Sequence, residues 1–181
     1  MNIKRILSLA IVFGMAFLIA GCNSNVSETV NEKENDNAKK YEKVFKETDV
    51  VAHDFMVVKI EQNYPEVLKY MSPKGIEELK EKSGNLLDAH RLPNEFEELD
   101  GEYELRRYDN FYDEENGEVI YRYSRHNDRG VIVNDWIILK QNEERDWKVR
   151  SYYDVRPDMI NESNSETGTV LHELPAEDKG K

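Results

Sequence analysis

Cysteine is almost absent from this chain of 181 residues, since Cys22 is the only one. An intrachain disulfide is therefore excluded, and the fold must be stabilised by a hydrophobic core. Basic residues are also in deficit, with 25 Lys and Arg against 37 Asp and Glu, which gives a net charge of -12. Binding to nucleic acid, or to an anionic membrane through charge, needs clustered Lys and Arg. The charge balance argues against both.

Motifs of the common catalytic and metal sites are missing as well. The sequence contains no glycine-rich phosphate-binding loop and no Gly-x-Ser-x-Gly elbow. Its four histidines lie far apart, and none has a second histidine four residues away. The acidic stretch that begins at Asp113 fails as a calcium loop because Glu118 occupies the sixth position, where glycine is needed. We therefore expect neither a metal nor a cofactor.

The first residues carry a secretory signal. Lys4 and Arg5 precede an apolar run at residues 6–20. The end of this run and the two residues after it read LIAGC, residues 18–22. This end resembles the lipobox of bacterial lipoproteins, an apolar residue followed by two small residues and a cysteine. The resemblance implies that residues 1–21 are removed and that Cys22 carries a diacylglyceryl anchor on the extracytoplasmic face of the cell membrane. The alternative is an uncleaved membrane anchor, but the apolar run is shorter than the roughly 20 residues that span a bilayer.

Composition divides the remaining chain into three parts. Residues 22–40 are strongly polar, which predicts a disordered tether behind the lipid. Residues 41–157 alternate apolar and polar positions and form the expected domain. Residues 158–181 are polar and acidic, which predicts a flexible tail. A docking segment remains an alternative for part of this tail, because it holds one compact apolar group, Val170, Leu171 and Leu174.

The first half of the domain has helical periodicity. One apolar stripe of a long helix comprises Val44, Val51, Phe55 and Val58, widened by Met56 and Ile60. Pro65 predicts a break, because proline removes a backbone hydrogen bond from a helix interior. A short helix follows, and Ser72-Pro73 then predicts the start of a third helix, with Ser as the N-cap.

The second half of the domain changes to a period of two. Alternation predicts four strands near residues 103–106, 119–123, 131–139 and 147–155. Asn116-Gly117 is a strong hairpin signal before the second strand. Helices followed by an antiparallel meander predict an α+β fold, in which N-terminal helices pack on a curved antiparallel sheet of four or more strands.

Two stretches of the domain suggest a family. Residues 63–73 read NYPEVLKYMSP at the end of the long helix, and residues 145–153 read RDWKVRSYY in the last predicted strand. In order and texture, the domain resembles the nuclear-transport-factor-two-like (cystatin-like) superfamily, which many small lipoproteins of Gram-positive bacteria contain. The resemblance implies that the sheet curls into a cone around the helices.

Enzymes of that fold, such as ketosteroid isomerase and scytalone dehydratase, use Asp, Tyr or His inside the cone. Here Asp135 interrupts the apolar face of the third predicted strand between Val133 and Ile137, and Arg107 and Asp109 are expected to alternate inward along the first strand. Together with the resemblance, this suggests a polar pocket at the mouth of the cone, formed by Asp135, Arg107, Tyr121 and Tyr153. The alternative, which we favour, is that Asp135 lies at a bulge or forms a structural ion pair with Arg107 or Arg125.

These observations predict a lipid-anchored, non-catalytic domain that binds a protein partner or a small ligand in the cell envelope. One alternative is an enzyme or ligand carrier that uses the cone interior around Asp135. Another is a passive spacer or regulatory subunit.

The lipobox prediction can be tested by Cys22→Ala. Without the thiol no diacylglyceryl group can be attached, so the variant should remain an unprocessed precursor or appear in the medium. Incorporation of a labelled fatty acid and the mass of the mature chain provide the measurement. A Cys22→Ala chain that is still mature and membrane-bound would contradict the prediction.

Overall fold

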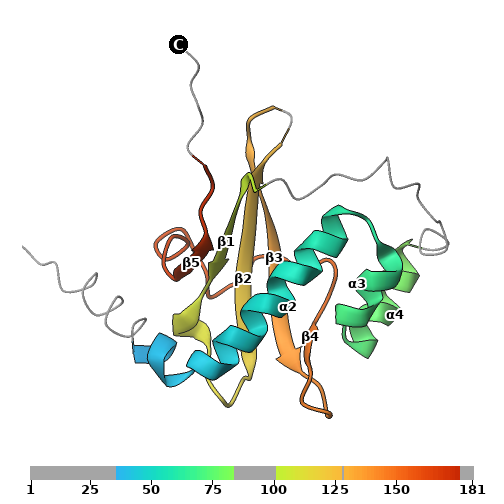
Figure 1. Cartoon of the computed structure of the whole chain (residues 1–181), viewed down its shortest axis with the longest axis horizontal. Coiled ribbons are helices and arrows are strands. Elements are labelled where there is room, and N and C mark those ends of the chain that lie inside the picture. Colours follow the sequence, from blue (N-terminus) through green and yellow to red (C-terminus); the bar gives the residue numbers. More distant parts are fainter. Residues whose placement is uncertain (1–35, 84–100, 128, 176–181) are drawn as a thin grey trace, which may run out of the picture.

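The computed structural model describes residues 36–83, 101–127 and 129–175. The predicted signal peptide, Cys22 and the tether up to residue 35 lie outside this part of the chain. A layer of helices covers one face of a five-stranded antiparallel sheet (Figure 1). The predicted α+β class is therefore confirmed. Within the described residues, no helix has both the length and the apolar character needed to cross a membrane.

The three predicted helices are present. They are α2 (Glu42–Ile60), α3 (Tyr64–Tyr70) and α4 (Pro73–Ser83). Gln62 separates the first two with a φ of 51°. Ser72 begins α4 as expected, because its Oγ accepts a hydrogen bond from the Gly75 N–H at 3.1 Å. Residues 36–40 are also helical, so the predicted tether is wrong for these five positions.

The buried face of α2 differs from the predicted stripe. Its buried side chains are Phe45, Thr48, Ala52, Phe55 and Met56. The valines predicted for this face, Val44, Val51 and Val58, are half-buried beside it. Counting only apolar side chains missed Thr48, whose hydroxyl donates to the Val44 carbonyl oxygen at 3.0 Å and is thereby satisfied inside the helix.

The sheet has the strand order β4-β3-β2-β1-β5. Its strands are β1 (Tyr103–Arg107), β2 (Glu118–His126), β3 (Ile132–Gln141), β4 (Trp147–Val149) and β5 (Thr169–His172), with the 3-10 turn η3 (Asp109–Phe111) after β1. In Figure 1, α2 crosses the sheet diagonally, with α3 and α4 beside it. The core between the two layers includes Leu105, Val119, Tyr121, Ile137 and Leu139.

The fourth strand is shorter than predicted. β4 ends at Val149, and the alternation through Ser151 and Tyr153 continues outside the sheet. The chain bends towards α4, where Ser151 Oγ donates a hydrogen bond to Glu78 Oε2 at 2.5 Å. Val155, predicted for the buried face, is 73% exposed. Period-two spacing alone does not distinguish a strand from an extended segment that pairs with a helix.

Residues 158–175 pack on the sheet, which agrees with the alternative of a docking segment around Val170 and Leu171 and differs from a flexible tail. β5 pairs with β1 and becomes the fifth strand of the sheet. Ahead of it, Ile160 is buried on the sheet face opposite the helices, in a second apolar cluster with Tyr108, Ile120, Trp136 and Ile138. The Tyr108 hydroxyl also donates a hydrogen bond to the Ser165 carbonyl oxygen at 2.8 Å.

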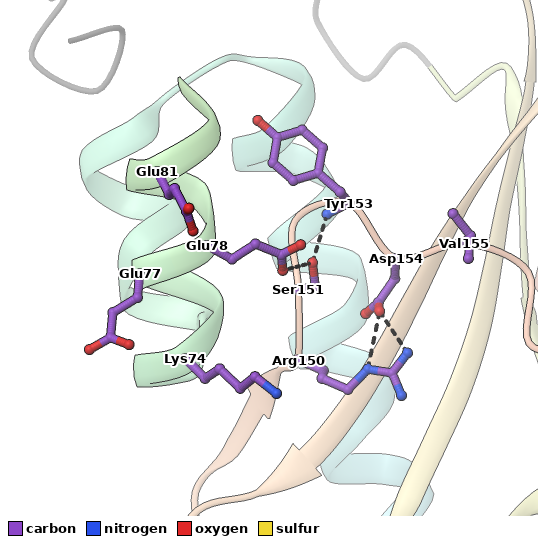
Figure 2. Close-up of a pocket in the computed structure, with 9 residues that line it drawn as sticks. All are labelled: Lys74, Glu77, Glu78, Glu81, Arg150, Ser151, Tyr153, Asp154 and Val155. Carbon is purple, nitrogen blue, oxygen red and sulfur yellow. Dashed lines mark hydrogen bonds and ion pairs between the residues drawn. The ribbon is translucent and has the colours of Figure 1, made fainter. Parts of the chain in front are cut away.

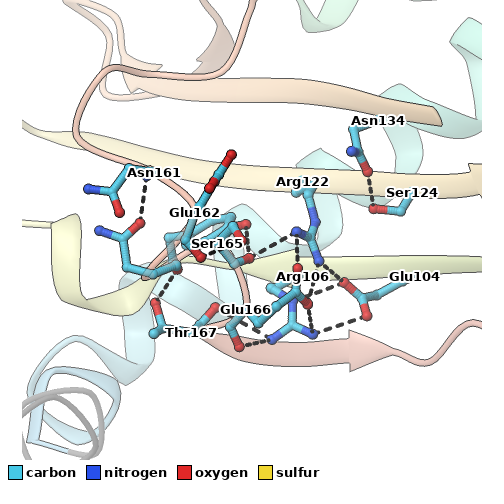
Figure 3. Close-up of polar contacts among 12 residues, drawn as sticks. Glu104, Arg106, Arg122, Ser124, Asn134, Asn161, Glu162, Ser165, Glu166 and Thr167 are labelled. Carbon is cyan, nitrogen blue, oxygen red and sulfur yellow. Dashed lines mark hydrogen bonds and ion pairs between the residues drawn. The ribbon is translucent and has the colours of Figure 1, made fainter. Parts of the chain in front are cut away.

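Ion pairs explain why a polar segment packs here (Figure 3). Arg122 on β2 bonds Glu166 Oε1 at 2.8 Å and Glu104 Oε1 at 2.7 Å. Arg106 on β1 donates to the Glu166 carbonyl oxygen at 2.7 Å. Hydrogen bonds from Arg122 hold the pKa of Glu166 below its ordinary value. The acidic composition of the segment therefore matches two arginines on the sheet, whereas composition alone predicted that it faces solvent.

Gly168 permits the close approach of this segment to β1. Its φ is +96°, and a Cβ at this position would overlap the carbonyl oxygen of Arg107. Gly101 provides a matched control, because its φ is +90° but a Cβ there would meet nothing within 4 Å. Both Gly→Ala changes should cost about 1–2 kcal/mol for the left-handed backbone. Gly168→Ala should cost more, since β5 must also move away from β1. Urea unfolding of both variants tests this, and equal losses would contradict it.

Candidate functional site

Arg107 and Tyr121 meet below α2, inside the domain. The Arg107 side chain is 7% exposed, and its Nη1 bonds Asp49 Oδ2 at 2.5 Å. Its Nε donates to Asp109, whose carboxylate also accepts a hydrogen bond from Thr169 on β5. The guanidinium lies 4.2 Å from the centroid of the Phe45 ring. Arg107 is therefore enclosed by two carboxylates and an aromatic ring.

Tyr121 completes the Arg107 network. Its hydroxyl lies 2.9 Å from Asp49 Oδ1 and 2.6 Å from Thr48 Oγ1. Burial raises the pKa of Tyr121 well above its ordinary value. Burial also raises the pKa of Asp49, although the hydrogen bond from Arg107 opposes this effect. The sequence reasoning missed Asp49, which lies in the polar run KETD at residues 46–49 and looks like part of a solvated helix face. Asp109, expected to point inward beside Arg107, is fully buried.

Asp135 does not belong to this network. It lies on β3, beside the C-terminal end of α2. It is opposite Tyr123 in the β2–β3 register, and its Oδ1 pairs with Lys59 Nζ at 2.8 Å. Lys59 also donates to the Tyr152 carbonyl oxygen at 3.3 Å and lies 4.8 Å from the centroid of the Tyr152 ring. The favoured interpretation of Asp135 as a member of an ion pair fits. One partner is Lys59, which the sequence reasoning did not consider.

An open pocket surrounds this ion pair, and we call it the Lys59 pocket. Its volume is about 340 Å³, and it is lined by Met56, Lys59, Ile60, Gln62, Tyr64, Arg125, Asp135 and Tyr152. Burial, together with Tyr64, raises the pKa of Tyr152. The volume is at the lower end of the range of small-molecule sites. The lining offers two cations, one carboxylate and two phenols, a set suited to a small ligand with hydrogen-bonding or anionic groups.

Tyr153 lies in a third place, a cleft between α4 and residues 150–155 (Figure 2). We call this cleft the acidic groove. Its volume is about 530 Å³, and it is lined by Lys74, Glu77, Glu78, Glu81, Arg150, Ser151, Tyr153, Asp154 and Val155. Tyr153 is 40% exposed, and its hydroxyl lies 2.8 Å from Ser83 Oγ. The single pocket predicted from Arg107, Tyr121, Asp135 and Tyr153 is therefore not formed, because only the first two side chains lie close together.

The described residues offer no group of three or more His, Cys, Asp or Glu side chains arranged to hold a metal ion. Comparison of the chain with protein-family models, with curated proteins and with solved structures gives no match.

Removal of the Arg107 charge tests the buried network. Arg107→Met keeps most of the side-chain volume but leaves the buried carboxylate of Asp109 and the half-buried carboxylate of Asp49 without their cation, so it should cost about 3–5 kcal/mol of unfolding free energy. Burial already raises the pKa of Asp49, and without the opposing hydrogen bond from Arg107 this pKa should rise further, so protonation would relieve the loss. The loss should therefore be smaller at about pH 4 than at about pH 7, when measured by urea unfolding.

Asp49→Asn is the matched control for this network. It keeps the side-chain shape, and Arg107 still has Asp109 as its partner, so the loss should be below about 1 kcal/mol. If Arg107→Met is no less stable than Asp49→Asn, the Arg107 network contributes little to the stability of the fold.

Proposed function

We propose that this chain is an extracytoplasmic lipoprotein, anchored through a diacylglyceryl group on Cys22, whose α+β domain binds a partner and does not transform a substrate. The observation that carries the proposal is the pairing of the interior charges. Arg107 is held between Asp49 and Asp109, and Lys59 is held by Asp135. Charges that are paired in this way stabilise the fold. The hollows beside them are open to the surface, where a partner can bind.

The anchoring part of the proposal rests on the sequence. A basic start, an apolar run and LIAGC together specify export, cleavage and lipidation at Cys22. Two acyl chains provide stable anchoring, whereas a single chain binds reversibly. The polar residues that follow Cys22 would hold the domain away from the lipid headgroups.

The binding part rests on the shape of the site. A catalytic site needs a base or nucleophile within reach of its substrate, with its protonation state free to change. The acidic groove instead offers carboxylates beside the exposed side chains of Tyr153 and Val155 on an open cleft. Such a mixture of charged and exposed apolar side chains suits an interaction surface.

A second candidate function uses the Lys59 pocket. It is favoured by one observation, the open volume of about 340 Å³ with Asp135 on its wall. In this case the domain would carry a small ligand or act on it, and Asp135 would exchange a proton with it while Lys59 held the charge. The double variant Asp135→Asn with Lys59→Met distinguishes the two candidate functions. It removes the ion pair of the Lys59 pocket and leaves the acidic groove intact, so it should impair function only if the Lys59 pocket is the site.

In-cell cross-linking tests the leading proposal. The full chain is purified from membranes after cross-linking, beside the Cys22→Ala form, and bound proteins are identified by mass. We expect a discrete partner with the lipidated form, and loss or strong depletion of that partner with Cys22→Ala. If the lipidated chain yields no specific partner, the binding proposal fails and the Lys59 pocket becomes the leading candidate.

A further inference from the structure

The acidic groove has an excess of negative charge. Four of its lining residues are acidic, and two, Lys74 and Arg150, are basic. Glu77 and Glu81 are exposed on one side of α4, and within the described part of the chain they form no ion pair (Figure 2). The groove can therefore accept cationic groups without breaking a contact of these two side chains.

Asp154 is a separate observation at the opposite wall of the groove. Its side chain is 3% exposed, and its Oδ1 accepts hydrogen bonds from Arg150 Nε at 3.1 Å and Nη2 at 2.8 Å. Its Oδ2 is buried and meets no hydrogen-bond partner among the described residues. Burial raises the pKa of Asp154 even though Arg150 opposes this effect. Because Oδ2 is buried and Oδ1 is bonded by Arg150, Asp154 shapes this wall of the groove and does not itself contact a ligand.

Lys82 shows how the groove contacts an ammonium group. Its Nζ bonds Glu78 Oε1 at 2.6 Å and lies 4.7 Å from the centroid of the Tyr153 ring. The ammonium group thus forms an ion pair with a carboxylate and a cation–π contact with an aromatic ring. Beyond the ring, the exposed side chain of Val155 adds an apolar surface that suits the methylene stem of Lys or Arg.

We propose that the acidic groove binds a lysine- or arginine-bearing polypeptide segment of a partner protein, with the cationic heads at Glu77 and Glu81 and an aliphatic stem against Tyr153 and Val155. This inference rests on the proposed binding function and names the chemistry of the partner. Free polyamines offer the same cationic groups, but they lack the backbone and the spacing of a polypeptide. The Tyr153 and Val155 wall favours the polypeptide because it extends contact beyond the charge.

The full chain in neutral detergent provides the test. Its affinity is measured by fluorescence anisotropy for a short labelled peptide in which Lys alternates with Ser, beside a peptide with Glu in place of Lys and with spermine as competitor. The double variant Glu77→Gln with Glu81→Gln should weaken binding of the Lys peptide about tenfold. The matched control, Glu47→Gln with Glu115→Gln, changes two exposed glutamates outside the groove and should leave binding unchanged.

The aromatic wall has its own pair of variants. Tyr153→Ala should weaken binding of the Lys peptide, whereas Tyr153→Phe keeps the ring and should not. Equal weakening by the groove and control double variants would overturn the proposal, since it would show attraction to net charge alone. Absence of Lys-peptide binding at low salt would overturn it too. Spermine binding as tight as peptide binding, with no effect of Tyr153→Ala, would overturn the assignment to a polypeptide.

Repeating the in-cell cross-linking with the Glu77→Gln and Glu81→Gln chain separates the two proposals. Loss of the partner supports the groove as its site. Retention of the partner overturns the groove assignment and leaves the proposed binding function standing.

Discussion

The buried charge of Arg107 is the constraint on which the rest of the structure depends. Its guanidinium on β1 bonds Asp49 on α2 and Asp109 after β1, and Asp109 in turn holds Thr169 on β5. One cation thus joins the helix layer, β1 and the edge strand β5. Removal of one partner from such a pair costs far more than the pair itself contributes, because the other charge stays buried. The network therefore fixes how these elements can dock.

That docking decides where the surface is hollow. With α2 fixed over β1 and β2 by Arg107, its C-terminal end places Lys59 against Asp135 on β3, and the Lys59 pocket lies around this pair. The chain after β4 bends towards α4 and forms the acidic groove. On the opposite face, Arg122 and Arg106 hold the C-terminal segment over a second apolar cluster. Both faces of the sheet thus carry packed segments. The Lys59 pocket and the acidic groove lie beside α3 and α4, and a further hollow of about 380 Å³ lies between α2 and strands β1 and β5.

The candidate site was predicted only in part. Asp135 was identified because a carboxylate interrupts an apolar strand, which is a local signal. Its partner Lys59 is 76 residues away, and no spacing rule connects the two. The acidic groove was not predicted, because glutamates along a helix give no sequence signal of a groove. They become a groove only when residues 150–155 lie opposite them.

By itself, the sequence determined what depends on neighbours along the chain: the presence of α2, α3 and α4, the alternation of β1 to β3 and the α+β class. The lipidation signal at Cys22 is equally local, and it stays a prediction. Periodicity, capping residues and proline act over a few positions, so they can be read locally. Only the tertiary structure decided the fate of residues 158–175, the end of β4 and the partner of each buried charge. Hydrophobic burial and ion pairing join residues that are distant in sequence, and an acidic segment faces solvent or docks according to the arginines that the fold presents to it.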